Sequence, residues 1–145
     1  TVTGENNETL IKAAARFTLA DVRRGRTVRI SRELLESYGP EDLPGIDGEL
    51  LRLREPESFD EERSIALLRS DFDFNGHVHN TRYIAFAMEA LPEEKYEKMD
   101  YTDLRIAFRS GAAGSRITVK RAAAEQGVFF CLYSEGRLCA MAELK

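Results

Sequence analysis

The sequence predicts an α+β domain in which a curved antiparallel sheet wraps one apolar helix. In residues 83–91 the one charged residue is Glu89, and a helix that is apolar nearly all round is typically buried. After residue 102, segments 103–109 and 116–120 alternate apolar and polar residues, as half-buried strands do. Two further strand segments follow at 128–133 and 137–143. Short turn sequences separate the last of these segments, which is typical of an antiparallel arrangement.

Length and composition limit the possible functions. A chain of 145 residues suits one ordinary domain, or one domain and a piece of another. The net charge of −4 argues against a nucleic-acid-binding protein. We find no signal peptide, membrane span or lipidation motif, so we expect a soluble cytoplasmic protein without membrane contact. Cys131 and Cys139 fall in neighbouring predicted strands, and we expect buried thiols there rather than a disulfide.

The first 39 residues predict a hairpin and a short helix. Residues 1–7 are polar, and we expect them to be loose. Residues 11–19 alternate as a half-buried strand, 21–26 form a turn, and 27–30 return. Ser31 is a suitable cap for a helix through Tyr38, which Gly39 and Pro40 close. Because an isolated hairpin cannot bury its apolar face, we expect this segment to lean on another surface.

Residues 40–61 are rich in proline and acidic residues, which indicates a linker. A strand over 64–69 then enters a polar loop at residues 70–79. The buried helix follows, with Asn80 as its N-cap and Pro92 as its stop. Residues 93–98 form a charged connection.

Four strands are expected in the last third, over residues 103–109, 116–120, 128–133 and 137–143. Residues 134–136 supply a tight turn between the last two. We expect the four strands to form an antiparallel meander. One helix wrapped by such a sheet is the hotdog arrangement.

The polar loop concentrates the side chains that could perform chemistry. It alternates Asp73, Asn75 and His77 with Phe72, Phe74 and Gly76. In an extended loop, the polar side chains would point one way while the aromatic ones anchor the other side. The amides at the start of the following helix could bind a carbonyl oxygen or an anion. Asp71, at the start of the loop, is expected to accept hydrogen bonds from backbone amides.

Residues 71–84 read Asp-Phe-Asp-Phe-Asn-Gly-His-Val-His-Asn-Thr-Arg-Tyr-Ile. This stretch resembles the signature of the fatty acyl-acyl carrier protein thioesterases, roughly D-L-D-x-N-x-H-V-N-N-x-x-Y-I. Residues 13–21 and 26–30 also resemble the closing strands of the first of two hotdog domains in a full-length member. The resemblance implies that residues 62–145 are the second hotdog domain and residues 1–39 the end of a truncated first one.

The resemblance implies that Asp73, Asn75 and His77 are the catalytic group. Thioester hydrolysis needs a base that activates water and a donor near the carbonyl oxygen. Asp73 and His77 could share the first task, with Asn75 and helix amides supplying the second. Which of Asp73 and His77 is the base stays open.

Three further residues, Asn80, Tyr83 and Phe86, are expected to bind substrate, the two aromatic ones as core or acyl-tunnel walls. The loop departs from the signature at Gly76, which replaces a larger polar residue, and at His79, which replaces an asparagine. His79 is interpreted as local structure. Together with His77 and Asp73 it also combines metal-ligating side chains, but no second ligand group accompanies them, so we expect no metal.

A further departure follows the strand over 103–109. The family usually places a catalytic Glu or Cys there, and this chain has Ser110 and Gly111. Glu89 and Asp103 are the alternative acids, since each lies in an element predicted next to the loop. Without such a group, we expect a slow enzyme or a binding protein.

The sequence therefore predicts an acyl-acyl carrier protein thioesterase of fatty acid biosynthesis that uses activated water and no cofactor. The alternative is a non-catalytic acyl-binding or regulatory hotdog domain. Basic residues on the predicted strands could meet the acidic carrier protein, or could form a solvated face. A single hotdog sheet leaves an open edge, so we expect a homodimer.

Overall fold

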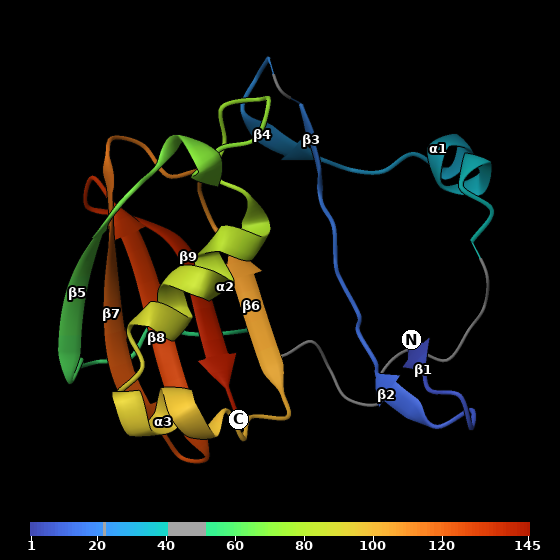
Figure 1. The fold of residues 1–145 in the computed structure, drawn as a ribbon. Helices are drawn as coiled ribbons and strands as arrows, with labels where there is room; N and C mark the ends of the chain where they lie inside the picture. Colours follow the sequence, from blue (N-terminus) through green and yellow to red (C-terminus); the bar gives the residue numbers. More distant parts are fainter. Residues whose placement is uncertain (22, 41–51) are drawn as a thin grey trace. The chain divides into compact units, whose positions relative to one another are not determined.

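The computed structural model describes residues 1–21, 23–40 and 52–145, and it divides the chain into two compact units, Thr1–Leu51 and Arg52–Lys145. The described part of the first unit holds two short ladders and one helix: β1 Val2–Thr3, β2 Thr9–Ile11, β3 Leu19–Asp21, β4 Arg26–Val28 and α1 Arg32–Ser37 (Figure 1). The β3–β4 hairpin confirms the predicted turn and return strand. Ser31 caps α1 as predicted, because its side chain accepts a hydrogen bond from Leu34 N at 3.2 Å.

The predicted long strand over 11–19 is wrong. Only its two ends are strands, and residues 12–18 have no regular structure. Residues 1–7 are more ordered than expected, since β1 pairs with β2 across a turn. None of the described residues of this unit is buried, and Phe17 is 84% exposed. An alternating pattern produces a half-buried strand only where a partner strand and a core are available, and the described part of this unit offers neither to residues 12–18.

The second unit has the hotdog fold that the sequence predicted. Its elements are β5 Glu61–Ala66, η1 Arg69–Asp71, α2 Asn80–Glu89, α3 Glu93–Lys98, β6 Leu104–Phe108, β7 Arg116–Ala124, β8 Gly127–Ser134 and β9 Arg137–Leu144. All strand pairs are antiparallel, in the order β5-β7-β8-β9-β6. Figure 1 shows α2 lying across one face of this sheet.

The strand order corrects the predicted four-strand meander. Only β7, β8 and β9 follow one another in the sheet, whereas β6 pairs with β9, from Leu104↔Leu144 to Phe108↔Ala140. The chain therefore crosses between β6 and β7 from the β6 edge of the sheet to the position beside β5, the opposite edge strand. The turn from β8 to β9 is as tight as expected, with Glu135 at φ 48° and Gly136 at φ 72°, the positive angles that a two-residue hairpin turn requires.

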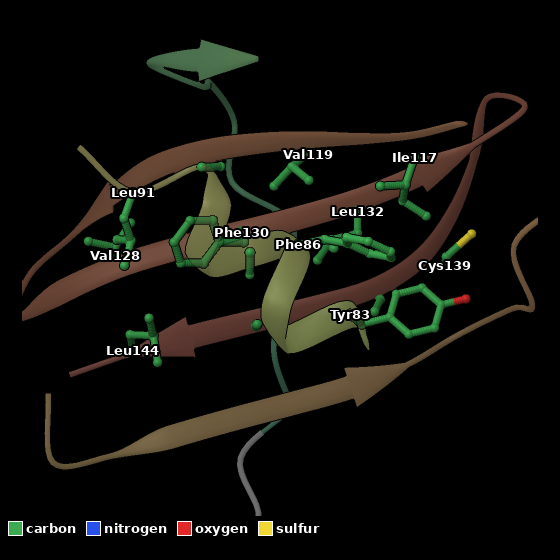
Figure 2. Close-up of a cluster of buried hydrophobic side chains, with 14 of the residues drawn as sticks. Tyr83, Phe86, Leu91, Ile117, Val119, Val128, Phe130, Leu132, Cys139 and Leu144 are labelled. Carbon is green, nitrogen blue, oxygen red and sulfur yellow. The ribbon is translucent and has the colours of Figure 1, made fainter. Parts of the chain in front are cut away.

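Helix α2 packs one face onto the sheet. Tyr83, Phe86, Ala87 and Ala90 are buried, and their i, i+3, i+4, i+7 spacing places them on one side of a helix. Figure 2 shows Tyr83 and Phe86 among buried residues of the strands with which all four form one core cluster: Ile117, Val119, Val128, Phe130, Leu132, Cys139 and Leu144. The opposite face is only half-buried in this unit, so the expectation of a helix buried all round is wrong.

Both helix ends and the first strand differ slightly from the prediction. His79, not Asn80, is the N-cap of α2, and its side chain makes no capping hydrogen bond. The helix ends at Glu89, and Pro92 instead precedes the short helix α3 in the predicted charged connection. Strand β5 begins at Glu61, three residues before the predicted start, because it pairs through charged residues such as Glu61 and Arg121.

The second face of the sheet is covered by residues 52–60, which the sequence placed in the linker. Leu53 and Phe59 pack against Phe129, Cys131 and Met141. The remaining predicted linker residues, 41–51, lie outside the described residues. In the described parts of the chain, no helix has the length and apolarity needed to cross a membrane.

The two cysteines are free and buried, as expected. Cys131 belongs to the cluster under residues 52–60, and Cys139 belongs to the cluster under α2. They therefore lie on opposite faces of the sheet. Burial raises the pKa of the Cys131 thiol to about 11.

Candidate active site

Residues 71–79 form a closed hairpin that leads into α2. Asp73 N donates to His77 O at 2.8 Å, His79 N donates to Asp71 O at 2.9 Å, and Phe72 bridges Val78. Gly76 sits at the turn with φ 74°, an angle that is strained for a residue with a side chain. The positive φ of this turn therefore accounts for the glycine at position 76, where the family signature has a larger polar residue. The loop is folded back on itself and is not the extended segment that its alternating pattern predicted.

The Asp73 carboxylate organises the tip of this hairpin. Its Oδ1 accepts hydrogen bonds from Asn75 N at 2.8 Å and from His77 N at 2.9 Å. The hydrogen bond from His77 N, the one from Asn75 N and the nearby His77 and His79 imidazoles lower the pKa of Asp73, against a smaller opposing effect of desolvation. Asp73 is therefore held as an anion, and a carboxylate with a lowered pKa is a weaker base.

Four other hairpin side chains are exposed: Phe74, Asn75, His77 and His79, with Phe74 at the tip 98% exposed. The expectation that Phe74 anchors the loop is wrong, since the turn carries it away from the core. Val78, which is buried, and Phe72 are the hairpin residues that pack in the core cluster. Among the described residues, no hydrogen bond joins the side chains of Asp73, Asn75 and His77 to one another. Their action as one catalytic cluster stays a prediction.

Asp71 is the buried polar group of the site. Its side chain is 1% exposed; Oδ2 accepts from Leu68 N at 2.7 Å, which confirms the predicted bond to a backbone amide. Oδ1 accepts from Arg82 Nε at 2.6 Å. Arg82 was not among the residues predicted for the site, although an arginine in the first turn of the helix that follows a buried acid was an available signal.

A second segment, residues 109–113, is tied to the first turn of α2. Ala112 N donates to the Tyr83 hydroxyl at 3.1 Å, and Ala113 N donates to Ser134 Oγ at 3.3 Å. Arg109 N and Ser110 N both donate to Cys139 O, at 2.7 and 3.3 Å. This segment is held in place on both sides, by the helix and by strands β8 and β9.

Ser110 and Gly111 occupy this second segment in different ways. Ser110 is half-buried, and its Oγ donates to Leu138 O at 2.8 Å and lies 3.9 Å from Cys139 Sγ. Gly111 is exposed, and a side chain at its position would meet no atom within 4 Å. Cys139, which the sequence analysis did not associate with the site, has no exposed surface and so cannot meet a substrate in this structure.

The residues predicted to bind substrate are divided by burial. Tyr83 and Phe86 are only 3% and 2% exposed, so they act as core residues in this unit, and burial raises the pKa of Tyr83. Asn80 is the exposed first residue of α2. The alternative acids lie elsewhere: Glu89 is at the far end of α2, about 15 Å along the helix, and Asp103 precedes β6.

A groove of about 340 Å³ runs beside the hairpin, between β5 and α2. Its lining includes Arg63, Ile65, Asp71, Arg82, Phe86 and Glu89. The Arg82 guanidinium lies 5.3 Å from the centre of the Phe86 ring, and Arg63 donates to Glu89 O. The groove thus combines apolar residues with Arg63, Asp71 and Arg82, whose charged side chains already have hydrogen-bond partners.

Three basic residues of the sheet are paired with acidic residues across strands. Arg121 Nη2 lies 2.6 Å from Glu61, Lys120 Nζ 3.3 Å from Glu62, and Arg105 Nη1 3.7 Å from Glu143. These pairs favour the interpretation of a solvated strand face. Among the described residues, no three His, Cys, Asp or Glu side chains gather as metal ligands.

This architecture has relatives of known family. The family described as acyl-ACP thioesterase C-terminal domain matches residues 54–135, which is more than half of the chain. The chain belongs to this family. The match begins in the segment that covers the second face of the sheet and includes both the hairpin and residues 109–113.

Solved structures agree on the fold of this family member. The 12:0-ACP thioesterase from Umbellularia californica is similar with a TM-score of 0.66 and 16% identity, over 86% of this chain and 51% of that one. An acyl-ACP thioesterase from Bacteroides thetaiotaomicron has a TM-score of 0.56 and 17% identity, over 71% of this chain and 43% of that one. The chain thus spans about half the length of these thioesterases or less. No match was found among curated protein sequences.

Proposed function

We propose that the chain acts in the hydrolysis of fatty acyl thioesters carried by acyl carrier protein, with Asp73, Asn75 and His77 as its catalytic group. The observation that carries this proposal is the closed hairpin at the start of α2. It presents the Asn75 and His77 side chains to solvent, where a substrate can reach them. Asp73, in contrast, is committed to the backbone of the hairpin.

In this proposal His77 is the general base. Asp73 accepts two backbone hydrogen bonds through Oδ1 and has a lowered pKa, so it is the weaker proton acceptor. His77 takes a proton from water while the water oxygen attacks the thioester carbonyl carbon. The Asn75 amide donates to the oxygen that becomes negative. The C–S bond then breaks, and the proton held by His77 passes to the departing thiolate, which leaves a free fatty acid and the carrier thiol.

Asp73 supports this step through the backbone of the hairpin. Its Oδ1 accepts hydrogen bonds from Asn75 N and His77 N, so it fixes the backbone that carries both side chains. Asp73 therefore assists the base without being the base.

A second candidate function is an acyl-binding or regulatory domain that holds the acyl chain without cleaving it. The hydrogen bond from Ser110 Oγ to Leu138 O and the missing side chain at Gly111 favour it. A serine whose hydroxyl proton is committed to a carbonyl, with no base beside it, cannot replace a carboxylate or a thiolate. We accordingly expect slow hydrolysis, with a kcat below about 1 per second.

The proposed setting is fatty acid biosynthesis in the cytoplasm, with acyl carrier protein as the partner and no metal or cofactor. Residues 1–39 are proposed to close a first hotdog domain, because none of the described residues of that unit is buried and it needs a covering surface. Strands β5 and β6 are the edges of the second sheet. A homodimer that covers such an edge is the proposed assembly.

One experiment separates the two candidate functions. Purified protein is incubated with acyl carrier protein loaded with acyl chains of increasing length, and released thiol and equilibrium binding are both measured. Thiol release above the buffer rate supports the hydrolase. Saturable binding without thiol release supports the acyl-binding domain. If neither binding nor thiol release is detected, both candidate functions are contradicted.

A further inference from the structure

The buried carboxylate of Asp71 joins three parts of the chain around the hairpin. Oδ2 accepts from Leu68 N, just before the hairpin, and Oδ1 accepts from Arg82 Nε, in the first turn of α2. The backbone oxygen of Asp71 accepts from His79 N and closes the stem of the hairpin. Asp71 therefore contacts the entry, the stem and the helix at once.

Because Asp71 is buried, the loss of these hydrogen bonds would be costly in free energy. Removing an ionised carboxylate from water is costly unless it is paired and hydrogen-bonded, and the Asp71 side chain is 1% exposed. Each of its oxygens has a donor at 2.7 Å or less. Arg82 is in turn placed over the Phe86 ring, and Phe86 is 2% exposed in the core. The hairpin is thus connected to the rigid core through Asp71, Arg82 and Phe86.

The side chains of the two aspartates of the hairpin bond to different parts of the chain. Asp73 bonds only within the hairpin, to the backbone of residues 75 and 77, so it sets the shape of the tip. Asp71 bonds to both flanking elements, so it sets where that tip lies relative to α2. A change at Asp71 or Arg82 should leave the Asp73 bonds available while releasing the whole hairpin.

We propose that Asp71, through its ion pair with Arg82, is a positioning residue that holds the Asn75–His77 hairpin against the first turn of α2. This inference deepens and rests on the proposed hydrolase function. Positioning has a large effect on rate, because a displacement of about 1 Å in a catalytic group can cost about 100-fold. The pair acts on turnover more than on substrate binding.

The test compares Arg82→Met with Arg82→Lys and Asp71→Asn. Arg82 is 40% exposed, so Arg82→Met keeps the aliphatic stem and removes the charged partner without changing the buried Asp71 side chain, which tests the ion pair even if Asp71→Asn fails to fold. Arg32→Met is the matched control, because Arg32 Nε pairs with Glu36 at 2.7 Å in α1. The first readout is the set of backbone ¹⁵N order parameters of residues 73–77, which needs no activity. The second is kcat and KM for the acyl thioester.

In Arg82→Met and Asp71→Asn, we expect the order parameters of the hairpin to fall from about 0.85 to below about 0.6, with those of β8 unchanged. The kcat should fall by about tenfold or more at a KM within about twofold. Arg82→Lys should recover part of both, and Arg32→Met should change neither. An ordered hairpin in a folded Arg82→Met protein overturns the inference, as does a loss of order spread equally over the sheet. If the unmodified protein releases no thiol, the hydrolase proposal fails, while the order parameters still decide the role of Asp71.

Discussion

Residues 71–79 and residues 109–113 are both bound to the start of α2, yet they differ in what their side chains leave available. In the first segment the aspartates bond to backbone amides and to Arg82, and Asn75 and His77 stay exposed. In the second, Ser110 bonds to Leu138 O and Gly111 has no side chain. Both scaffolds are complete, but the first alone presents groups suited to acid–base chemistry. Scaffold and chemistry can therefore be altered separately in this domain.

The largest effect is expected from His77→Ala. Loss of the proposed base should reduce turnover by roughly 100-fold or more, measured as thiol release from acyl carrier protein. His79→Ala is the control in the same hairpin, because His79 is exposed and its side chain makes no capping bond. Similar rates for the two variants would move the chemistry away from His77.

The second segment can be given the missing group. Gly111→Glu should raise turnover by roughly 10- to 100-fold, the scale of one acid–base group, because the position is exposed and has room for a side chain. The gain should disappear in the Gly111→Glu/His77→Ala double variant. Ser110→Glu is the matched comparison, and we expect it to lose stability without gaining activity, since it removes the bond to Leu138 O beside buried Cys139. A larger gain in turnover from Ser110→Glu than from Gly111→Glu would show that the missing acid belongs at position 110 and not at position 111.

The hydrogen bond between residues 109–113 and helix α2 depends on the Tyr83 hydroxyl. Tyr83→Phe removes the acceptor of the Ala112 N–H bond and keeps the ring in the core, so it should cost about 1 kcal/mol of unfolding free energy. Urea unfolding measures this change. Tyr96→Phe, on exposed α3, should be close to neutral, and an equal loss in both variants would refute the specific role of the Tyr83 hydroxyl.

The smallest effect concerns the charge of Asp73. Its pKa in the folded protein is lowered from 3.8, so the ionised carboxylate stabilises the folded state at pH values above 3.8, and this contribution is lost as pH falls through the folded pKa. Asp73→Asn should therefore differ from the unmodified protein by a constant, small amount at neutral pH, and the difference should shrink on acidification below 3.8. Unfolding curves at several pH values test this. A difference that grows toward acid pH would mean that the carboxylate is not stabilised as an anion.

Local sequence patterns predicted most of the secondary structure. The apolar run at 83–91 predicted α2, and Ser31 predicted the cap of α1. The alternation in 103–109 and 116–120 predicted β6 and β7, and the segments 128–133 and 137–143, joined by a tight turn, predicted β8 and β9. Each signal depends on neighbours a few residues apart, which helix and strand periods make readable. The same reasoning failed at residues 12–18, where the alternation is present but the described unit supplies no core.

The roles of individual site residues depended on partners distant in the chain. The signature at 71–84 pointed to Asp73, Asn75 and His77, but not to the hairpin that exposes Phe74 or to Arg82 as the partner of Asp71. Strand order is another case: β6 lies beside β9 because the sheet closes over α2, and no local pattern encodes that choice. The same pairing brings Ser110 next to Cys139, 29 residues away in the chain. Sequence periodicity specifies which face of an element is apolar, whereas packing decides which other element covers it, since burial and hydrogen bonding are satisfied only in the assembled fold.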